Sequence, residues 1–194
     1  MIITIGRECG CNGNKIGRAL AEKYHMAFYD KSVISKCAQD KGIYDRYPDF
    51  YKEVPGNTLM YTISMEEDEE SVLYETPKKA LSGLIGTKDC VLLGRCGNWA
   101  FKDRDDKISI FLTGDEKWRT ENIARKQEIS SRSARHKMIQ TDERRKSYHE
   151  YYTGQAWGDA KNYDLCLNVT DLGVDGALAV IETYLQQSGI EAGK

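Results

Sequence analysis

Two short segments are apolar almost without interruption, and they constrain the fold more than any other feature of the sequence. These segments are VLL at 91–93 and ISIFL at 108–112. A strand with one face in water alternates apolar and polar residues, whereas a strand covered on both faces is apolar throughout. The two segments therefore predict an α/β fold in which helices cover both faces of a parallel sheet.

Strand and helix patterns alternate along the chain. Short apolar runs are followed by apolar residues at every third or fourth position, which is the pattern of an amphipathic helix. Residues 42–65 look irregular, and 66–70 (EEDEE) read as a solvated face or a helix start. Ser131 is placed to cap the helix after it. Strands are predicted at 2–5, 27–29, 90–93, 107–112 and 164–169, and helices at 16–24, 33–37, 73–85, 115–128, 132–152 and 174–185.

The charge balance excludes two classes of partner. The 194 residues include 28 Lys and Arg against 30 Asp and Glu, a formal net charge of −2. Proteins dedicated to nucleic acid or to anionic membranes carry a basic excess. No run of 18 apolar residues could cross a membrane, and MIITIGRECG has no signal-peptide core. We expect a cytoplasmic protein that binds neither nucleic acid nor membrane, and the sequence leaves its oligomeric state open.

The ends of the predicted strands indicate where a ligand would bind. In open parallel sheets, ligands bind beyond the carboxyl ends of the strands. The residues that directly follow a predicted strand are therefore site candidates. They are Gly6–Gly13, Asp30, Gly94–Arg95, Thr113–Gly114 and Thr170.

The first of these segments is a glycine-rich loop between a strand and a helix. Glycines admit positive φ and let backbone N–H groups approach an anion, and the helix N-terminus adds partial positive charge. A phosphate site is the functional interpretation, and an ordinary glycine-rich turn is the alternative. The loop departs from the standard G-x-x-x-x-G-K-[ST] motif. With Gly13 as the second glycine, Glu8 replaces the first, and Asn14 and Lys15 replace the Lys and the Ser/Thr.

The phosphate-binding lysine is thus displaced in the sequence. Lys15 comes one or two positions late, and each position rotates a helical side chain by about 100°. Its long side chain could still reach back to the loop. Arg18, one helical turn further on, is a weaker candidate.

Several stretches together resemble the cytidylate kinase-like family of P-loop proteins. They are GRECGCNGNKIGRALAEKYHMAFYDKSVI, CVLLGRCGNWAF, the run Asp142-x-x-Arg145-x-x-Tyr148, YYTGQAWGDAKNYDLCLN and LGVDGALAVIETYL. The resemblance covers most of the chain and weakens around 40–75. It implies a P-loop NTPase-type fold with a five-stranded parallel sheet sandwiched by helices. It further implies a single nucleoside-monophosphate-kinase-like domain over 1–194, with an irregular NMP-binding segment at about 40–75 and a helical lid at about 117–160.

The resemblance also implies an activity and a set of site residues. The expected reaction moves the γ-phosphate of ATP, with Mg²⁺, to CMP, dCMP or a related small phosphorylated acceptor. Asp30 would face the reacting phosphates or Mg²⁺, Arg95 would grip the acceptor phosphate, and Arg145 would close with the lid. With Lys15 these form the expected catalytic set, and Arg144 is an expected substrate contact. The expected ATP-binding residues are Gly6, Arg7, Glu8, Gly10, Asn12, Gly13, Asn14 and Lys15.

Two departures from the family keep a second function open. Cytidylate kinases follow the equivalent of Arg95 with an Asp that helps to read cytosine, whereas this chain has Cys96. The Lys-Ser/Thr pair of the P-loop is also missing. The alternative is therefore a nucleotide- or anion-binding module with little or no kinase activity, since fold does not determine substrate.

The segment Lys117–Lys146 is strongly basic and follows the predicted fourth strand. Guanidinium groups match phosphate oxygens, as a lid over phosphates requires, and a solvated helix face is the alternative. His136 on this segment and His149 just after it receive no role. The aromatic residues after them are expected to pack, with base stacking as the alternative. The arginines are Arg119, Arg125, Arg132, Arg135, Arg144 and Arg145, and the aromatic residues are Tyr148, Tyr151, Tyr152 and Trp157.

The six cysteines fit no metal-binding pattern, and we expect reduced thiols. Cys90 and Cys166 lie in apolar runs and are predicted to be buried. Cys9 and Cys11 lie beside a predicted helix N-terminus, which lowers the pKa of a thiol. Whether these two are redox-active stays open.

Overall fold

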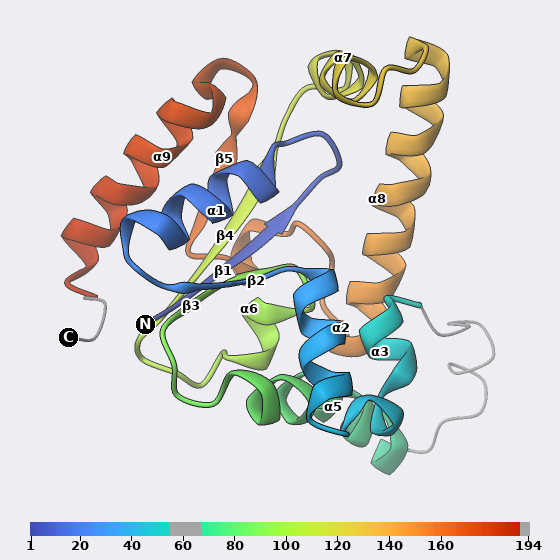
Figure 1. Cartoon of the computed structure of the whole chain (residues 1–194), viewed down its shortest axis with the longest axis vertical. Helices are drawn as coiled ribbons and strands as arrows, with labels where there is room; N and C mark the ends of the chain where they lie inside the picture. Colours follow the sequence, from blue (N-terminus) through green and yellow to red (C-terminus); the bar gives the residue numbers. More distant parts are fainter. Residues whose placement is uncertain (55–66, 191–194) are drawn as a thin grey trace.

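A computed structural model describes residues 1–54 and 67–190. Its centre is a five-stranded sheet in the order β2-β3-β1-β4-β5, with every neighbouring pair parallel (Figure 1). The predicted α/β class with a five-stranded parallel sheet is confirmed. The strands are β1 (Ile2–Arg7), β2 (Ala27–Tyr29), β3 (Cys90–Leu93), β4 (Lys107–Thr113) and β5 (Leu165–Asn168).

Helices connect successive strands, as parallel pairing requires. Among the described residues they are α1 (Gly13–Lys23), α2 (Lys31–Asp40), α3 (Pro48–Lys52), α5 (Glu67–Ile85), α6 (Gly97–Ala100), α7 (Glu116–Gln127), α8 (Ser131–Thr153) and α9 (Val169–Ser188), with short 3₁₀ turns at Tyr44–Arg46 and Ala160–Asn162. The backbone at Gly173 is not helical, so the regular part of α9 follows that residue.

Each face of the sheet packs against its own set of helices. Ile3 and Ile5 lie in a buried core with α1 and α9. Ile2 and Leu92 belong to a second core, with α2, α3, α5, α6 and the C-terminal part of α8. Strand residues point alternately to the two faces, so both faces need apolar side chains. This burial explains why the apolar segments of β3 and β4 lack alternation.

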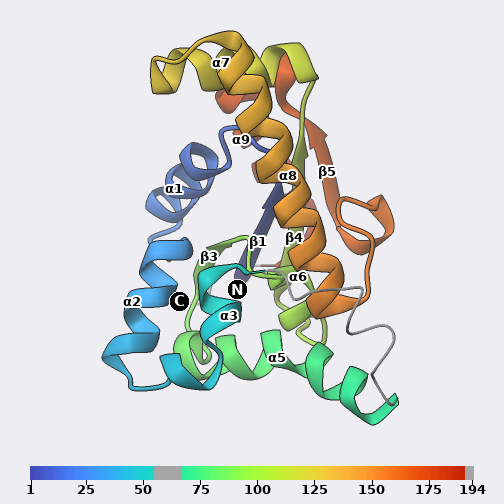
Figure 2. The ribbon, with the colours of Figure 1, turned by 90° about the vertical axis from the view of Figure 1, so that its right-hand side faces the viewer.

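The helices α7 and α8 lie in the segment for which a helical lid is predicted. They follow β4 and pack on each other through Ile123, Ala134 and Met138. The long helix α8 then runs from the α7 end of the molecule toward α5 (Figure 2). The helix α8 therefore contacts the glycine-rich loop through Asp142, and its C-terminal part packs in the core that includes α5.

Three local expectations differ from the structure. Part of the segment predicted as irregular is helical, because Pro48 starts α3 at a position where its missing N–H is not needed. The short helix α6 was not predicted. Ser130, rather than Ser131, caps α8, since its Oγ accepts from the Ser133 N–H at 3.2 Å. Positions 55–66 of the expected NMP-binding segment lie outside the described residues.

Within the described ranges, none of the helices is both long and apolar enough to cross a membrane.

The close packing of α1 on β2 gives a test of the fold. A Cβ added to Gly17 of α1 would lie 2.7 Å from the Phe28 ring, whereas one on Gly83 of α5 would meet only Ile43 at 3.5 Å. We expect Gly17→Ala to lower the free energy of unfolding by about 1–3 kcal/mol through overpacking. Gly83→Ala should raise it by up to about 1 kcal/mol, because Ala favours a helix over Gly.

Urea unfolding of both variants would measure these changes. Equal effects of the two substitutions would contradict the close approach of α1 to β2.

Candidate functional site

The glycine-rich loop joins β1 to α1 and is tied to the elements beside it. Oε2 of Glu8 accepts from the Thr113 hydroxyl (2.6 Å) and the Gly114 N–H (3.0 Å) at the end of β4. Nδ2 of Asn122, on α7, donates to the carbonyl of Gly10 at 2.6 Å. The loop is therefore held in shape by polar side chains.

The lid helix α8 adds a carboxylate to this loop. Asp142 accepts from the Cys9 N–H through Oδ1 and from Arg119 Nη1 through Oδ2, each at 2.6 Å. Burial raises the pKa of Asp142, against the lowering effect of these two hydrogen bonds. Four further loop N–H groups have no acceptor within the described residues, so they could bind an anion. They belong to Gly10, Asn12, Gly13 and Asn14.

The loop borders a pocket of about 280 Å³, which we call the loop pocket. Its wall combines backbone N–H groups with cationic side chains from β1, α7 and α8. This is the chemistry that binds phosphate groups. The lining residues are 7–14, Leu93, Asn122, Ile123, Lys126, Gln127 and Arg145.

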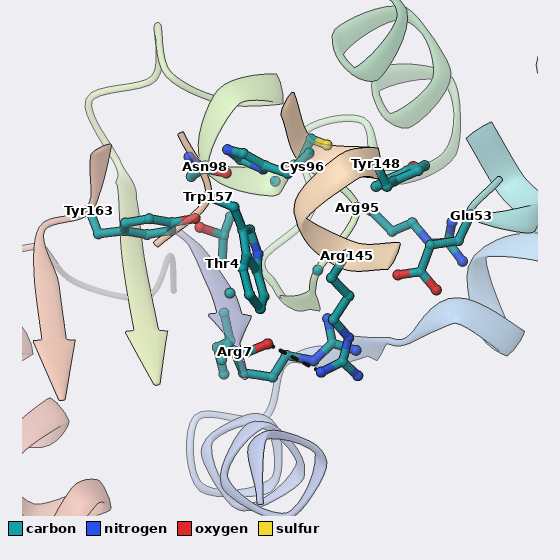
Figure 3. A pocket seen from close by; sticks show the side chains of 15 residues that line it. Thr4, Arg7, Glu53, Arg95, Cys96, Asn98, Arg145, Tyr148, Trp157 and Tyr163 are labelled. Atoms are coloured by element: carbon teal, nitrogen blue, oxygen red, sulfur yellow. Dashed lines mark hydrogen bonds between the residues drawn. The ribbon is translucent and has the colours of Figure 1, made fainter. Parts of the chain in front are cut away.

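A second, smaller cavity of about 30 Å³ adjoins it, and we call it the arginine pocket (Figure 3). Arg7 and Arg145 line both cavities, so the two meet at these side chains. Figure 3 shows Arg95, Arg145, Glu53 and Tyr148 on one side of the arginine pocket and Thr4, Asn98, Trp157 and Tyr163 on the other. The lining residues are Thr4–Arg7, Glu53, Gly94–Asn98, Arg145, Tyr148, His149, Trp157 and Tyr163.

The turn after β3 places Arg95 in this cavity. Gly94, Arg95 and Cys96 all have positive φ (79°, 61° and 52°). Residues other than glycine rarely adopt this conformation, and such outliers cluster at functional sites. A Cβ on Gly94 would collide with the Arg7 guanidinium. The turn therefore brings the Arg95 and Arg7 side chains into one cavity.

The buried Arg95 meets the half-buried Arg7 and Arg145 there, and Arg145 Nη1 also lies 3.9 Å from Asp142 Oδ1. Arg95 is 2% exposed; its Nη1 donates to Phe50 O (2.6 Å), and its Nη2 has no partner. Arg145 Nη1 donates to Arg7 O (3.2 Å), and its Nε is also buried without a partner. Burial, and then the charge of Arg145, lowers the pKa of Arg7 to about 9, which leaves it protonated at neutral pH.

Glu53 is the carboxylate that lines the arginine pocket. Burial tends to raise its pKa, but Arg95, Arg7 and Arg145 outweigh burial and hold the pKa below its usual value. The lining side chains then carry a formal excess of two positive charges, three guanidiniums against one carboxylate. Buried charge of this kind requires a counter-ion. The cavity is therefore suited to a dianion.

The side chains of His149, Cys96 and Tyr148 at the arginine pocket are neutral. Burial lowers the pKa of His149 to about 4, so its imidazole is uncharged at neutral pH. Burial also raises the pKa values of the Cys96 thiol and the Tyr148 hydroxyl, so both stay protonated. Asn98 Nδ2 donates to Gln155 Oε1 at 3.4 Å. Tyr148 packs on Phe50, as expected, while also lining the cavity.

The predicted site residues divide into two groups. Arg95 and Arg145 come together in the arginine pocket with Gly6 and Arg7, and the loop residues line the loop pocket. Lys15 and Arg144 are exposed and line neither cavity. Helical rotation explains both, since each lies beside a residue that faces inward.

Asp30 also lies outside both cavities and caps α2. Oδ1 accepts from the N–H groups of Ser32 and Val33, both at 3.0 Å, and Oδ2 accepts from Arg18 Nη2 at 3.1 Å. Burial tends to raise the pKa of Asp30, but these hydrogen bonds and the Arg18 charge lower it below its usual value.

Sequence reasoning did not select several residues that complete the site. Glu53, Asn122 and His149 lie on segments far apart in the chain, and nothing in their spacing marks them. Asp142 belongs to the run Asp142-x-x-Arg145, which was the available signal for its role. Each of the four contacts the loop or lines a cavity only through tertiary packing.

The cysteines behave mostly as structural residues. All six thiols are free, and Cys90 is buried as predicted. Cys166 is exposed, contrary to the prediction, because β5 is an edge strand and alternates between buried and exposed positions. Burial raises the pKa of Cys11 to about 12, the opposite of the activation that a helix N-terminus alone would give.

The capping role of Asp30 can be tested by stability. Asp30→Ala should lower the free energy of unfolding by about 1 kcal/mol, because it removes the acceptor for two N–H groups at the start of α2. Asp30→Ser should lose less, since Ser is also a good cap. Urea unfolding would compare the two. Equal losses would mean that the carboxylate charge, rather than the cap, stabilises α2.

Comparisons with known proteins identify the family of this chain. The family model for the cytidylate kinase-like family matches residues 2–171. Two similar curated proteins are cytidylate kinases, from Pyrococcus horikoshii (23% identical over 95% of this chain and 88% of that protein) and Methanocaldococcus jannaschii (24%, 95% and 97%). An uncharacterized protein from Eubacterium ventriosum has a similar crystal structure, with a TM-score of 0.74 and 28% identity over 96% of this chain and 98% of that one. The family match spans most of the sequence, and the chain therefore belongs to the cytidylate kinase-like family.

Proposed function

We propose that this protein is a phosphotransferase that moves the γ-phosphate of ATP to a nucleoside monophosphate of the CMP or dCMP kind. One observation carries the proposal: Arg7, Arg95 and Arg145 line one cavity against the single lining carboxylate Glu53, with two buried nitrogens unpartnered, and Arg7 and Arg145 also line the loop pocket. The names of the curated relatives support a nucleotide as the acceptor.

The loop pocket would bind the donor. Its unpartnered N–H groups and the N-terminus of α1 suit the phosphates of ATP. Arg7, Arg145 and Lys126 supply positive charge along the wall, in place of the lysine of a standard P-loop. Lys15 is left out of this proposal because its side chain is exposed.

The arginine pocket would bind the acceptor phosphate. A phosphate monoester carries about two negative charges at neutral pH, which match the excess positive charge of the lining side chains. Arg95 Nη2 and Arg145 Nε would then gain the partner they lack. Glu53 limits the excess charge while the pocket holds no phosphate.

Transfer between the two cavities would depend on position and charge. In phosphoryl transfer, negative charge spreads over the moving group, and cations placed around it lower the barrier. Arg7 and Arg145 line both cavities and would contact that group from two sides. The helix α8 would exclude water from it.

Mg²⁺ would enter as part of the MgATP substrate. Such ions are held mainly by substrate phosphates, water and one or two carboxylates. No group of three or more metal-ligating side chains exists in the described ranges, which fits this mode of binding. Glu8 is the carboxylate that lines the loop pocket, whereas Asp30 is engaged as a cap.

The second candidate function is a nucleotide- or anion-binding module with little kinase activity. The observation in its favour is that Asp142 already binds the Cys9 N–H, while the loop lacks the usual Lys-Ser/Thr pair. Such a module would bind ATP without transferring phosphate.

A coupled ADP-release assay separates the two functions. The acceptors should be CMP, dCMP, UMP, AMP and small phosphorylated metabolites, with ATP hydrolysis without acceptor as the blank. We expect turnover with at least one nucleoside monophosphate. ATP binding by calorimetry without any turnover would support the binding module instead.

Arg145 provides a sharper test of the mechanism. Its contact with the transferred group forms mainly in the closed complex, so Arg145→Ala should lower kcat about 30- to 1,000-fold and change ATP affinity less. Arg132 is exposed on the same helix and lines neither cavity, so Arg132→Ala is the matched control. A wild-type kcat for Arg145→Ala at an unchanged melting temperature would remove Arg145 from the reaction.

A further inference from the structure

His149 is a buried polar residue that the proposed reaction does not use. It lies on α8, is 4% exposed and lines the arginine pocket. Its Nε2 is buried without a hydrogen-bond partner. Among the described residues only four buried side-chain nitrogens are in this state, and three of them, on Arg95, Arg145 and His149, line this one pocket.

Packing alone does not account for an imidazole at this position. Most buried polar groups have partners, because an unsatisfied one costs free energy on folding. If His149 only filled space, an apolar side chain of similar size would make the folded protein at least as stable. Burial lowers the pKa of His149 to about 4, so the ring is neutral and its unpartnered nitrogen can exchange a hydrogen bond with an uncharged group.

The helix places His149 at a defined distance from the phosphate site. His149 follows Arg145 by four residues, so the two share a face of α8 about 6 Å apart along its axis. Arg145 contacts the loop residue Arg7, and α8 runs from there toward α5, so His149 lies further from the loop.

Trp157, Tyr163, Asn98 and Cys96 line the same pocket as His149 and carry the other neutral polar groups there. Cys96 contributes a protonated thiol, a weak hydrogen-bonding group. Asn98 Nδ2 already donates within the protein. The single lining carboxylate, Glu53, faces the arginines, whose charges lower its pKa. Apart from the arginine nitrogens, His149 Nε2 is the polar side-chain atom lining this pocket that is buried without a partner among the described residues.

We propose that Nε2 of His149 hydrogen-bonds an uncharged hydroxyl or amino group of the acceptor that lies about one helical turn from its phosphate, which makes His149 a specificity-determining residue. The inference rests on the proposed function, because it assumes that the phosphate binds at Arg95 and Arg145. The acceptor is then a phosphate monoester that also carries a neutral polar group. In a nucleoside monophosphate, this group would be a pentose hydroxyl or a base amine.

The test compares variants against acceptors that differ by one group. His149→Phe keeps a ring and removes Nε2, His149→Gln keeps a polar group at a similar position, and His136→Phe is the control at an exposed histidine of the same helix. Kinetics would be measured with CMP, dCMP and UMP. We expect His149→Phe to raise the acceptor KM about 10-fold or more with the ATP KM unchanged, and His149→Gln to recover part of the loss.

The analogues identify the group that His149 binds. If it is the 2′-hydroxyl, His149→Phe should reduce the preference between CMP and dCMP; if it is the base amine, the preference between CMP and UMP should fall. An unchanged acceptor KM and unchanged preferences in folded His149→Phe would overturn the inference while leaving the kinase function intact.

A binding measurement on the wild-type protein covers the case in which the Phe variant does not fold. In ¹⁵N-imidazole NMR spectra, CMP should shift the His149 ring signals and inorganic phosphate should not. A CMP-dependent shift without turnover would support the inference and reject the kinase. No shift with CMP, at concentrations that saturate the protein, would overturn the role of His149.

Discussion

The structure around the site depends on three like charges that line one cavity, Arg95 buried and Arg7 and Arg145 half-buried. Arg7, Arg95 and Arg145 come from the end of β1, the turn after β3 and the lid helix α8, and Glu53 comes from the end of α3. Bringing guanidiniums together away from water is costly unless an anion joins them. The arginine pocket therefore links the sheet, the lid and the segment after α2 around a shared need for a dianion.

A set of carboxylates keeps the surrounding elements in place. Asp142 joins α8 to the glycine-rich loop and to Arg119, and Glu8 joins the same loop to the end of β4. Hydrogen bonds to charged groups are stronger than neutral ones, especially where water is excluded. The lid and the loop consequently form one wall, and the two cavities lie on either side of the Arg7 and Arg145 side chains.

The sequence was informative where a local rule applied. The carboxyl ends of parallel strands identified Arg95 and the glycine-rich loop, and both line the cavities. The same rule selected Asp30, which caps α2 instead, because Ser32 and Val33 offer it two nearer N–H donors. Lys15 and Arg144 were selected by residue type and position, but a single step along a helix turns a side chain from the cavity to the solvent.

What the sequence alone determined is the parallel sheet, the order of its helices and the loop after the first strand. These follow from periodicity and from glycine, which act over a few residues. The tertiary structure decided which polar groups meet: Glu53 joins arginines that lie more than 40 positions away, and α8 brings Asp142 to the glycine-rich loop and His149 to the cavity beside the turn after β3. Their hydrogen bonds and burial depend on distances between elements. Local spacing in a sequence does not encode those distances, so only the folded chain could reveal them.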